Sequence, residues 1–115
     1  MKQLILCLFL VAGLSACSQD NSINSESKKL NDEACTSLEK FAEHVMRQHQ
    51  SNTLMSTVFK EVDSMSDVPE GSKEILKNIA IDAYKQPVFT DQSIRDRQVV
   101  DFANDTHLKC LEIMK

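Results

Sequence analysis

The chain has 115 residues, 13 of them basic and 17 acidic, with a net charge of −4 when the histidines are neutral. That length allows one small domain, and the acidic balance disfavours nucleic acid and anionic lipid headgroups, since both bind basic surfaces. The only glycines are Gly13 and Gly71. Their scarcity excludes the glycine-rich phosphate loops of nucleotide enzymes.

The first 17 residues have the organisation of an export signal. Lys2 precedes an apolar run from Leu4 to Leu14. This run is too short to cross a bilayer as a helix, which takes about 20 apolar residues, but it fits the apolar region of a signal peptide. It ends in Leu14-Ser15-Ala16-Cys17, which resembles the lipobox of bacterial lipoproteins. A plain secretory signal cut near Ala16 is the alternative interpretation.

The lipobox resemblance implies that a signal peptidase removes residues 1–16 and that the Cys17 sulfur carries a diacylglyceryl group. The new amino group is then acylated, for example with palmitate. Two or more acyl chains anchor a protein stably, at about 0.8 kcal/mol per buried CH₂. In such lipoproteins an Asp after the cysteine favours the inner membrane, and this chain has Ser18 there. We therefore expect an outer-membrane lipoprotein that faces the periplasm.

After the signal, we expect residues 17–31 to be the lipidated cysteine and a disordered tether, and residues 32–115 to be a helical domain. The tether is rich in serine, asparagine and charge, and between residues 18 and 31 only Ile23 and Leu30 are apolar. Such a composition buries too little surface to offset the entropy of ordering. Loss of Lys2 leaves 12 basic residues against 17 acidic ones, a net charge of −5, which would suit a basic protein partner.

The cysteines predict one disulfide. Cys7 lies in the removed signal and Cys17 is assigned to lipid, so Cys35 and Cys110 remain as a pair. In an oxidising compartment such a pair favours a disulfide. Closing so long a loop stabilises the folded state by about 4–5 kcal/mol. Two buried thiols are the alternative, whereas a zinc site lacks the usual ligand spacing.

Apolar residues recur at three- and four-residue spacing, which predicts four helices and no strand. We expect helices over about residues 32–49, 53–65, 72–85 and 91–113, the third capped by Ser72 and ended by Pro87. The predicted fold is all-α, a small four-helix bundle-like domain with one disulfide. The side chains expected to face inward are Ala34, Cys35, Leu38, Phe41, Ala42, Val45, Met46, Met55, Val58, Phe59, Val62, Met65, Ile75, Leu76, Ile79, Ala80, Ala83, Val99, Phe102, Ala103, Thr106, Cys110 and Ile113 or Met114.

The region after the tether is similar to small, uncharacterised exported helical proteins of Gram-negative bacteria. The shared features are Cys35 at the start of the first helix, the segment Ala83-Tyr84-Lys85-Gln86-Pro87 after the third, and the run from Phe102 to Cys110 in the last. The resemblance implies the helical fold and carries no activity with it.

No residue pattern indicates catalysis or a metal site. His44 and His49 are five residues apart and so lie on different faces of a helix, and His107 has no second histidine nearby. No His-Glu-x-x-His or Gly-x-Ser-x-Gly motif occurs. We therefore expect no enzyme, no metal and no cofactor.

The remaining expectation is a lipid-anchored, non-enzymatic module that binds another envelope protein. One alternative is an immunity or inhibitor protein against a cell-wall-targeting toxin, and another is a structural envelope lipoprotein without a tight partner. The possible partner face comprises Arg95, Asp96, Asp101 and Asp105 on the last helix and Phe89 in the connector before it. A merely solvated polar face is the alternative for these residues.

Overall fold

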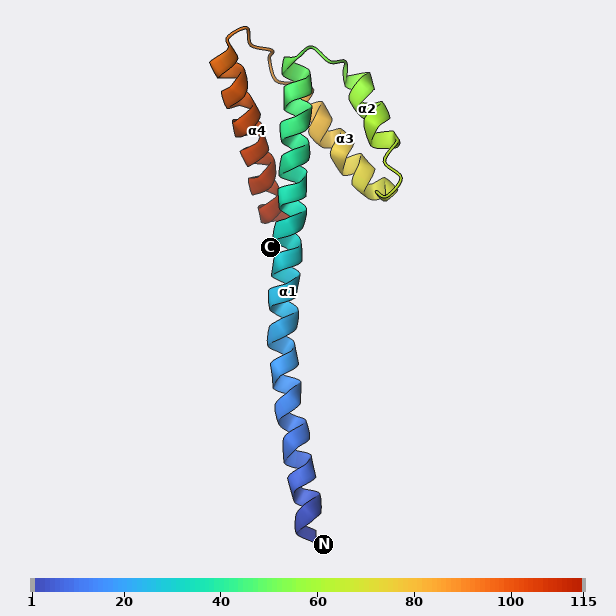
Figure 1. Ribbon diagram of the computed structural model, residues 1–115, viewed down its shortest axis with the longest axis vertical. Coiled ribbons are helices and arrows are strands. Elements are labelled where there is room, and N and C mark those ends of the chain that lie inside the picture. The colour runs from blue at the N-terminus through green and yellow to red at the C-terminus, as the bar shows by residue number, and fades with distance from the viewer. Residues whose placement is uncertain (1, 115) are drawn as a thin grey trace. The chain divides into compact units, whose positions relative to one another are not determined.

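The computed structural model describes the backbone of residues 2–114 and the side chains of residues 26–114. The chain divides into two compact units, Met1–Glu33 and Ala34–Lys115. Four helices follow one another: α1 (Lys2–Gln50), α2 (Met55–Asp63), α3 (Glu70–Tyr84) and α4 (Gln92–Ile113), with no strand in the described part of the chain (Figure 1). The all-α, four-helix prediction is confirmed. The side chains of the expected signal, residues 1–16, and of Cys17 lie outside the described residues.

Helix α1 begins long before the predicted start near residue 32. The backbone of residues 26–31, expected as part of the tether, is helical, and Leu30 is 64 % exposed. No proline or glycine lies between residues 14 and 50, so no residue in this stretch interrupts the helical hydrogen bonds. Because residues 26–31 bury little apolar surface, the expectation that they act as a spacer stays a prediction.

The end of α1 is set by a left-handed residue. Asn52 has a φ of 63°, a conformation that asparagine tolerates better than most residues. The N–H of Thr53 donates to the carbonyl of Gln48 at 2.9 Å, and the N–H of Asn52 donates to that of His49 at 3.0 Å. This pair of bonds is a Schellman motif, which satisfies the last carbonyls of the helix.

The starts of α3 and α4 differ in how well the sequence predicts them. Helix α4 begins at Gln92, close to its predicted start, and Asp91 caps it, its Oδ1 accepting from the N–H of Ser93 at 2.8 Å and of Ile94 at 3.3 Å. The predicted Ser72 cap of α3 is wrong, since α3 begins at Glu70 with Pro69 as its N-cap. The φ of Pro69 is −60°, so the ring already holds the backbone where the helix starts.

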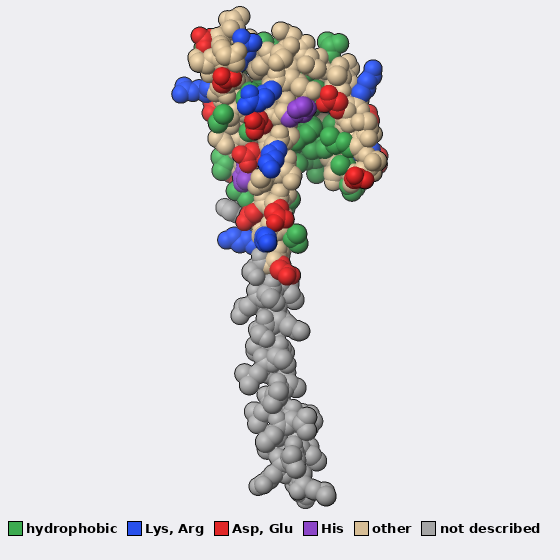
Figure 2. Space-filling model, in the orientation of Figure 1, with side chains coloured by type: hydrophobic (Ala, Val, Ile, Leu, Met, Phe, Trp, Pro, Cys, Tyr) green, Lys and Arg blue, Asp and Glu red, His purple; other side chains and the backbone are tan. Residues whose placement is uncertain are grey.

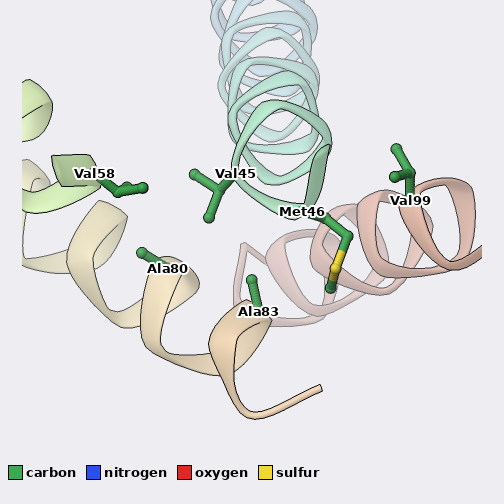
Figure 3. Close-up of a cluster of buried hydrophobic side chains, with 6 residues drawn as sticks. All are labelled: Val45, Met46, Val58, Ala80, Ala83 and Val99. Atoms are coloured by element: carbon green, nitrogen blue, oxygen red, sulfur yellow. The ribbon is translucent and has the colours of Figure 1, made fainter. Parts of the chain in front are cut away.

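The core is a small cluster of buried side chains around α1 in the Ala34–Lys115 unit. Figure 3 shows its six members: Val45, Met46, Val58, Ala80, Ala83 and Val99. Of these six, α3 contributes only Ala80 and Ala83, and its Tyr84 packs against the cluster. Burying each of the larger side chains stabilises the fold by about 1.5–3 kcal/mol.

Some of the side chains expected to face inward are exposed, so that part of the prediction is wrong. Ala34 and Met55 are exposed at the margins of the domain, Ile75 is 51 % exposed and Ile113 is 84 % exposed. Ile75 and Ile113 belong to stripes with the correct helical spacing, but α3 and α4 do not close over them. Helical spacing of apolar residues shows that they share one face of a helix, but it does not show whether another element covers that face.

The disulfide between Cys35 and Cys110 is confirmed, with a Cα–Cα distance of 5.5 Å. That distance lies within the usual range for disulfides. Both residues are buried, and the bond ties α4 to α1 within the Ala34–Lys115 unit. The last turn of α4 is thereby fixed against α1.

The connector between α3 and α4 is held against the end of α1 by hydrogen bonds. Gln50 is 4 % exposed; its Nε2 donates to the carbonyl of Pro87 at 2.8 Å and its Oε1 accepts from the N–H of Phe89 at 2.9 Å. The hydroxyl of Tyr84 donates to the carbonyl of Thr53 at 2.6 Å. The aromatic-proline segment therefore has a structural role.

Candidate functional site

A groove lies between α3 and α4 in the Ala34–Lys115 unit. Both helices pack on α1, but α3 leans away from α4 on the other side of α1 (Figure 1). The groove has a volume of about 400 Å³ and is open to solvent. A volume of this size falls within the usual range for binding pockets, about 300–1,000 Å³.

The floor and the narrow end of the groove are fixed by covalent and polar contacts. Leu38 of α1 and the disulfide-bonded Cys110 line the groove. At the connector end, Nε2 of Gln98 donates to Oε1 of Gln86 at 3.3 Å. The hydrogen bond joins the segment after α3 to α4, and the disulfide fixes the last turn of α4 against α1.

Large apolar side chains line both walls. Ile75 and Ile79 come from α3, and Phe102 and Ile113 come from α4. Ile113 is 84 % exposed and Ile75 is 51 % exposed, whereas Phe102 is partly buried against the core. The groove is therefore an apolar surface that the described residues of this chain leave open to solvent.

Charged residues of both signs stand on the rims. Asp82 and Lys85 on the α3 side form an ion pair at 3.8 Å, and both are more than half exposed. Asp105 and Lys109 lie on the α4 side, and neither forms an ion pair with another side chain in the described part of the chain. Figure 2 shows the same mixture of signs across one face of the domain, which carries no extended region of one charge.

A second, smaller hollow of about 180 Å³ lies where α4 begins beside the end of α1. Arg47, Gln92, Arg95 and Asp96 are among its lining residues. Nε of Arg95 is buried without a hydrogen-bond partner, but Asp96 places a carboxylate in the same hollow and Arg47 is already paired with Glu43 at 3.0 Å. The carboxylate disfavours an anion, so the α3–α4 groove is the better candidate site.

The structure places the five residues predicted as a partner face in different surroundings, and the prediction that they bind a partner stays a prediction. Arg95 and Asp96 line the smaller hollow, Asp105 stands on the rim of the groove, and Asp101 is exposed and lines neither. Phe89 is partly buried and its N–H is held by Gln50. Sequence reasoning missed Ile75 and Ile113 because it assigned the whole apolar stripe to the core.

The three histidines have separate partners. Nδ1 of His107 lies 2.9 Å from Oε2 of Glu39, joining α4 to α1, and Nε2 of His44 lies 3.6 Å from Oε2 of Glu61, joining α1 to α2. His49 contacts the connector, with Nε2 2.6 Å from a backbone carbonyl. Between residues 26 and 114, no three or more His, Cys, Asp or Glu side chains are grouped so as to hold a metal ion.

Two side chains with displaced pKa values have structural partners. Burial, and then the negative charge of Glu61, raise the pKa of Tyr84. Hydrogen bonds from the Ser93 hydroxyl and from the N–H groups of Ile94 and Ser93 lower the pKa of Asp91. Neither side chain lines the groove. The two pKa shifts therefore reflect contacts at the ends of helices and not a binding site.

Among the residues whose side chains are described, no helix has the length and apolar character needed to span a bilayer. Comparison with known proteins finds no family model, no curated protein and no solved structure that matches this chain. The groove and the amino-terminal sequence are therefore the features of this chain that bear on function.

Proposed function

We propose that this chain is an exported, lipid-anchored, non-enzymatic module that binds another envelope protein through the α3–α4 groove. The lipobox Leu14-Ser15-Ala16-Cys17 supports the anchor, and the disulfide between Cys35 and Cys110 fits an oxidising compartment. The observation that carries the binding role is the open apolar groove, whose wall residue Ile113 is 84 % exposed.

An apolar groove on so small a domain favours a binding role. Clustered exposed apolar side chains with a polar rim are typical of interaction sites. The lining residues include neither histidine nor serine, and Cys110 is in a disulfide. The groove therefore lacks a serine or cysteine nucleophile with a histidine base beside it.

The anchor is tested by metabolic labelling with radioactive palmitate in a bacterial host that processes lipoproteins. The wild-type chain should take up label, and Cys17→Ser should abolish the label and leave an unprocessed or soluble form. Cys7→Ser is the matched control, because Cys7 precedes the cleavage site. Equal labelling of wild type and Cys17→Ser would disprove the anchor.

The binding role is tested by crosslinking in living cells followed by affinity isolation of the full chain. The structure offers a matched pair of variants on α4: Ile113→Lys changes the groove wall, and Leu108→Lys changes a residue that is 58 % exposed and does not line the groove. Because both side chains are largely exposed, neither substitution should unfold the domain.

Wild type and Leu108→Lys should retain one stoichiometric protein partner that Ile113→Lys loses. A spectrum of low-abundance neighbours that is the same for all three chains would contradict the proposal. That result would favour a structural lipoprotein without a tight partner.

A further inference from the structure

The two walls of the groove are helix faces against which a further helix could pack. On α3 the lining residues Ile75, Asn78, Ile79 and Asp82 follow the spacing i, i+3, i+4, i+7. This spacing places them in one row along the helix surface, where ridges of side chains receive the ridges of a neighbouring helix.

The α4 wall repeats the pattern. Phe102, Asp105, Thr106 and Lys109 have the same spacing, and Ile113 extends the row by one further turn. On α3 the lining residues run from 75 to 82, with 85 and 86 in the turn that follows, and on α4 they span 102–113, about 16 Å at 1.5 Å per residue. The groove is therefore about three helical turns long.

The arrangement of the four helices leaves a place for a further helix. α1 packs against α3 and α4 through Val45, Met46, Ala83 and Val99 (Figure 3), and Leu38 lies on the floor between the two walls. A helix laid over Leu38 would contact α3 and α4 at once and bury the exposed parts of both walls.

We propose that the occupant is an amphipathic helix of about three turns, supplied by the partner protein and carrying an apolar stripe at i, i+3, i+4, i+7. This inference rests on the proposed protein-binding function and names the kind of segment that is bound. The stripe packs on Ile75, Ile79, Phe102 and Ile113, in the helix-in-groove mode of recognition.

The rim charges specify the flanks of the bound helix. Asp82 and Lys85 are three residues apart, and Asp105 and Lys109 are four apart, so each rim presents one charge of each sign about one helical turn apart. A helix with a basic residue opposite Asp105 and an acidic one a turn away, opposite Lys109, is complementary. Exposed pairs of this kind contribute more to specificity than to affinity.

Between residues 26 and 114, a second copy of this chain offers no exposed apolar stripe outside the groove. Outside the groove, the large apolar side chains that are exposed between residues 26 and 114 are Leu30, Leu54, Met55, Val88, Ile94, Val100, Leu108 and Met114. No two of these are three or four residues apart, so together they form no apolar row that could lie in the groove.

The test is photocrosslinking of the full chain in its envelope, with a benzophenone side chain in place of Ile113 and, as the control, in place of Leu108. Digested adducts are sequenced by mass spectrometry to identify the joined segment. The Ile113 position should yield adducts with one protein segment that has the apolar helical spacing, and Leu108 should yield background only.

Two further variants make the assay specific for the groove. Ile75→Glu on the opposite wall should lower the adduct yield by about tenfold or more, because a carboxylate replaces buried apolar contact. Asp105→Lys combined with Lys109→Asp keeps the net charge and should lower the yield by a few fold. An unchanged yield in the Ile75→Glu chain would overturn docking between the two walls.

The identity of the adduct separates this inference from the proposed function. A joined lipid, a second copy of this chain, or a segment without helical spacing would overturn the amphipathic-helix inference. If the Ile113 position yields no more adduct than Leu108, both the inference and the proposed binding role are wrong.

Discussion

Replacing Gln50 with leucine should destabilise the domain more than any other single polar substitution in the connector region. Gln50 is 4 % exposed at the end of α1. Its amide holds the connector twice, donating to the carbonyl of Pro87 at 2.8 Å and accepting from the N–H of Phe89 at 2.9 Å. Leucine preserves the approximate volume of the side chain and removes both hydrogen bonds.

The expected loss of stability comes from the backbone groups of Pro87 and Phe89 that lose their hydrogen-bond partner. A buried donor or acceptor that loses its partner costs about 1–3 kcal/mol, and water reaches part of this connector. We therefore expect Gln50→Leu to lower the free energy of unfolding by about 2–3 kcal/mol. Small domains have about 5–15 kcal/mol in total, so the loss should be conspicuous.

The chain carries its own probe for this experiment. Tyr84 is the single tyrosine and there is no tryptophan, so intrinsic fluorescence in a urea titration reports on the connector directly. Gln92→Leu is the control, because Gln92 is exposed and its side chain bonds only to Asp96, at 2.9 Å. The control should change the unfolding free energy by less than about 0.5 kcal/mol. If the urea midpoint of Gln50→Leu equals that of the wild type, the hydrogen bonds of Gln50 do not stabilise the connector.

Three further predictions concern the disulfide and the two displaced pKa values. Replacing Cys35 and Cys110 together with alanine should lower the unfolding free energy by about 4 kcal/mol or more, measured by the same titration; unchanged melting would contradict a stabilising bond. Asp91 has a lowered pKa, so its contribution is present above about pH 3.8 and is lost as the pH falls through its folded value; Asp91→Asn should keep the cap and remove that part of the acid dependence. Tyr84 has a raised pKa, so its contribution is present below about pH 10 and is lost as the pH rises further. Absorbance titration should find the tyrosinate forming at higher pH in the folded chain than in urea, and Glu61→Gln should reduce the difference.

Local chemistry explains the parts of the fold that the sequence predicts well. The end of α1 follows from Ser51-Asn52-Thr53, because asparagine accepts the left-handed conformation that ends the helix. The start of α4 follows from Asp91, whose carboxylate caps the first N–H groups. The bond between Cys35 and Cys110 follows from counting cysteines once Cys17 is assigned to lipid.

Other features depend on contacts between residues far apart in the chain. The role of Gln50 was not predictable from α1 alone, because its partners Pro87 and Phe89 lie more than 30 residues later. In the same way, nothing local to Phe89 indicates that its N–H donates to the side chain of Gln50.

The sequence by itself determined the disulfide pair, the four helices and the face of each helix that carries its apolar residues. These follow from short-range spacing and from the chemistry of single residues. Only the tertiary structure decided which of those apolar residues are covered. Ile75 and Ile113 have the helical spacing of core residues, yet α3 and α4 diverge over Leu38 and leave both exposed. Periodicity describes one helix at a time, whereas a groove depends on the angle between two.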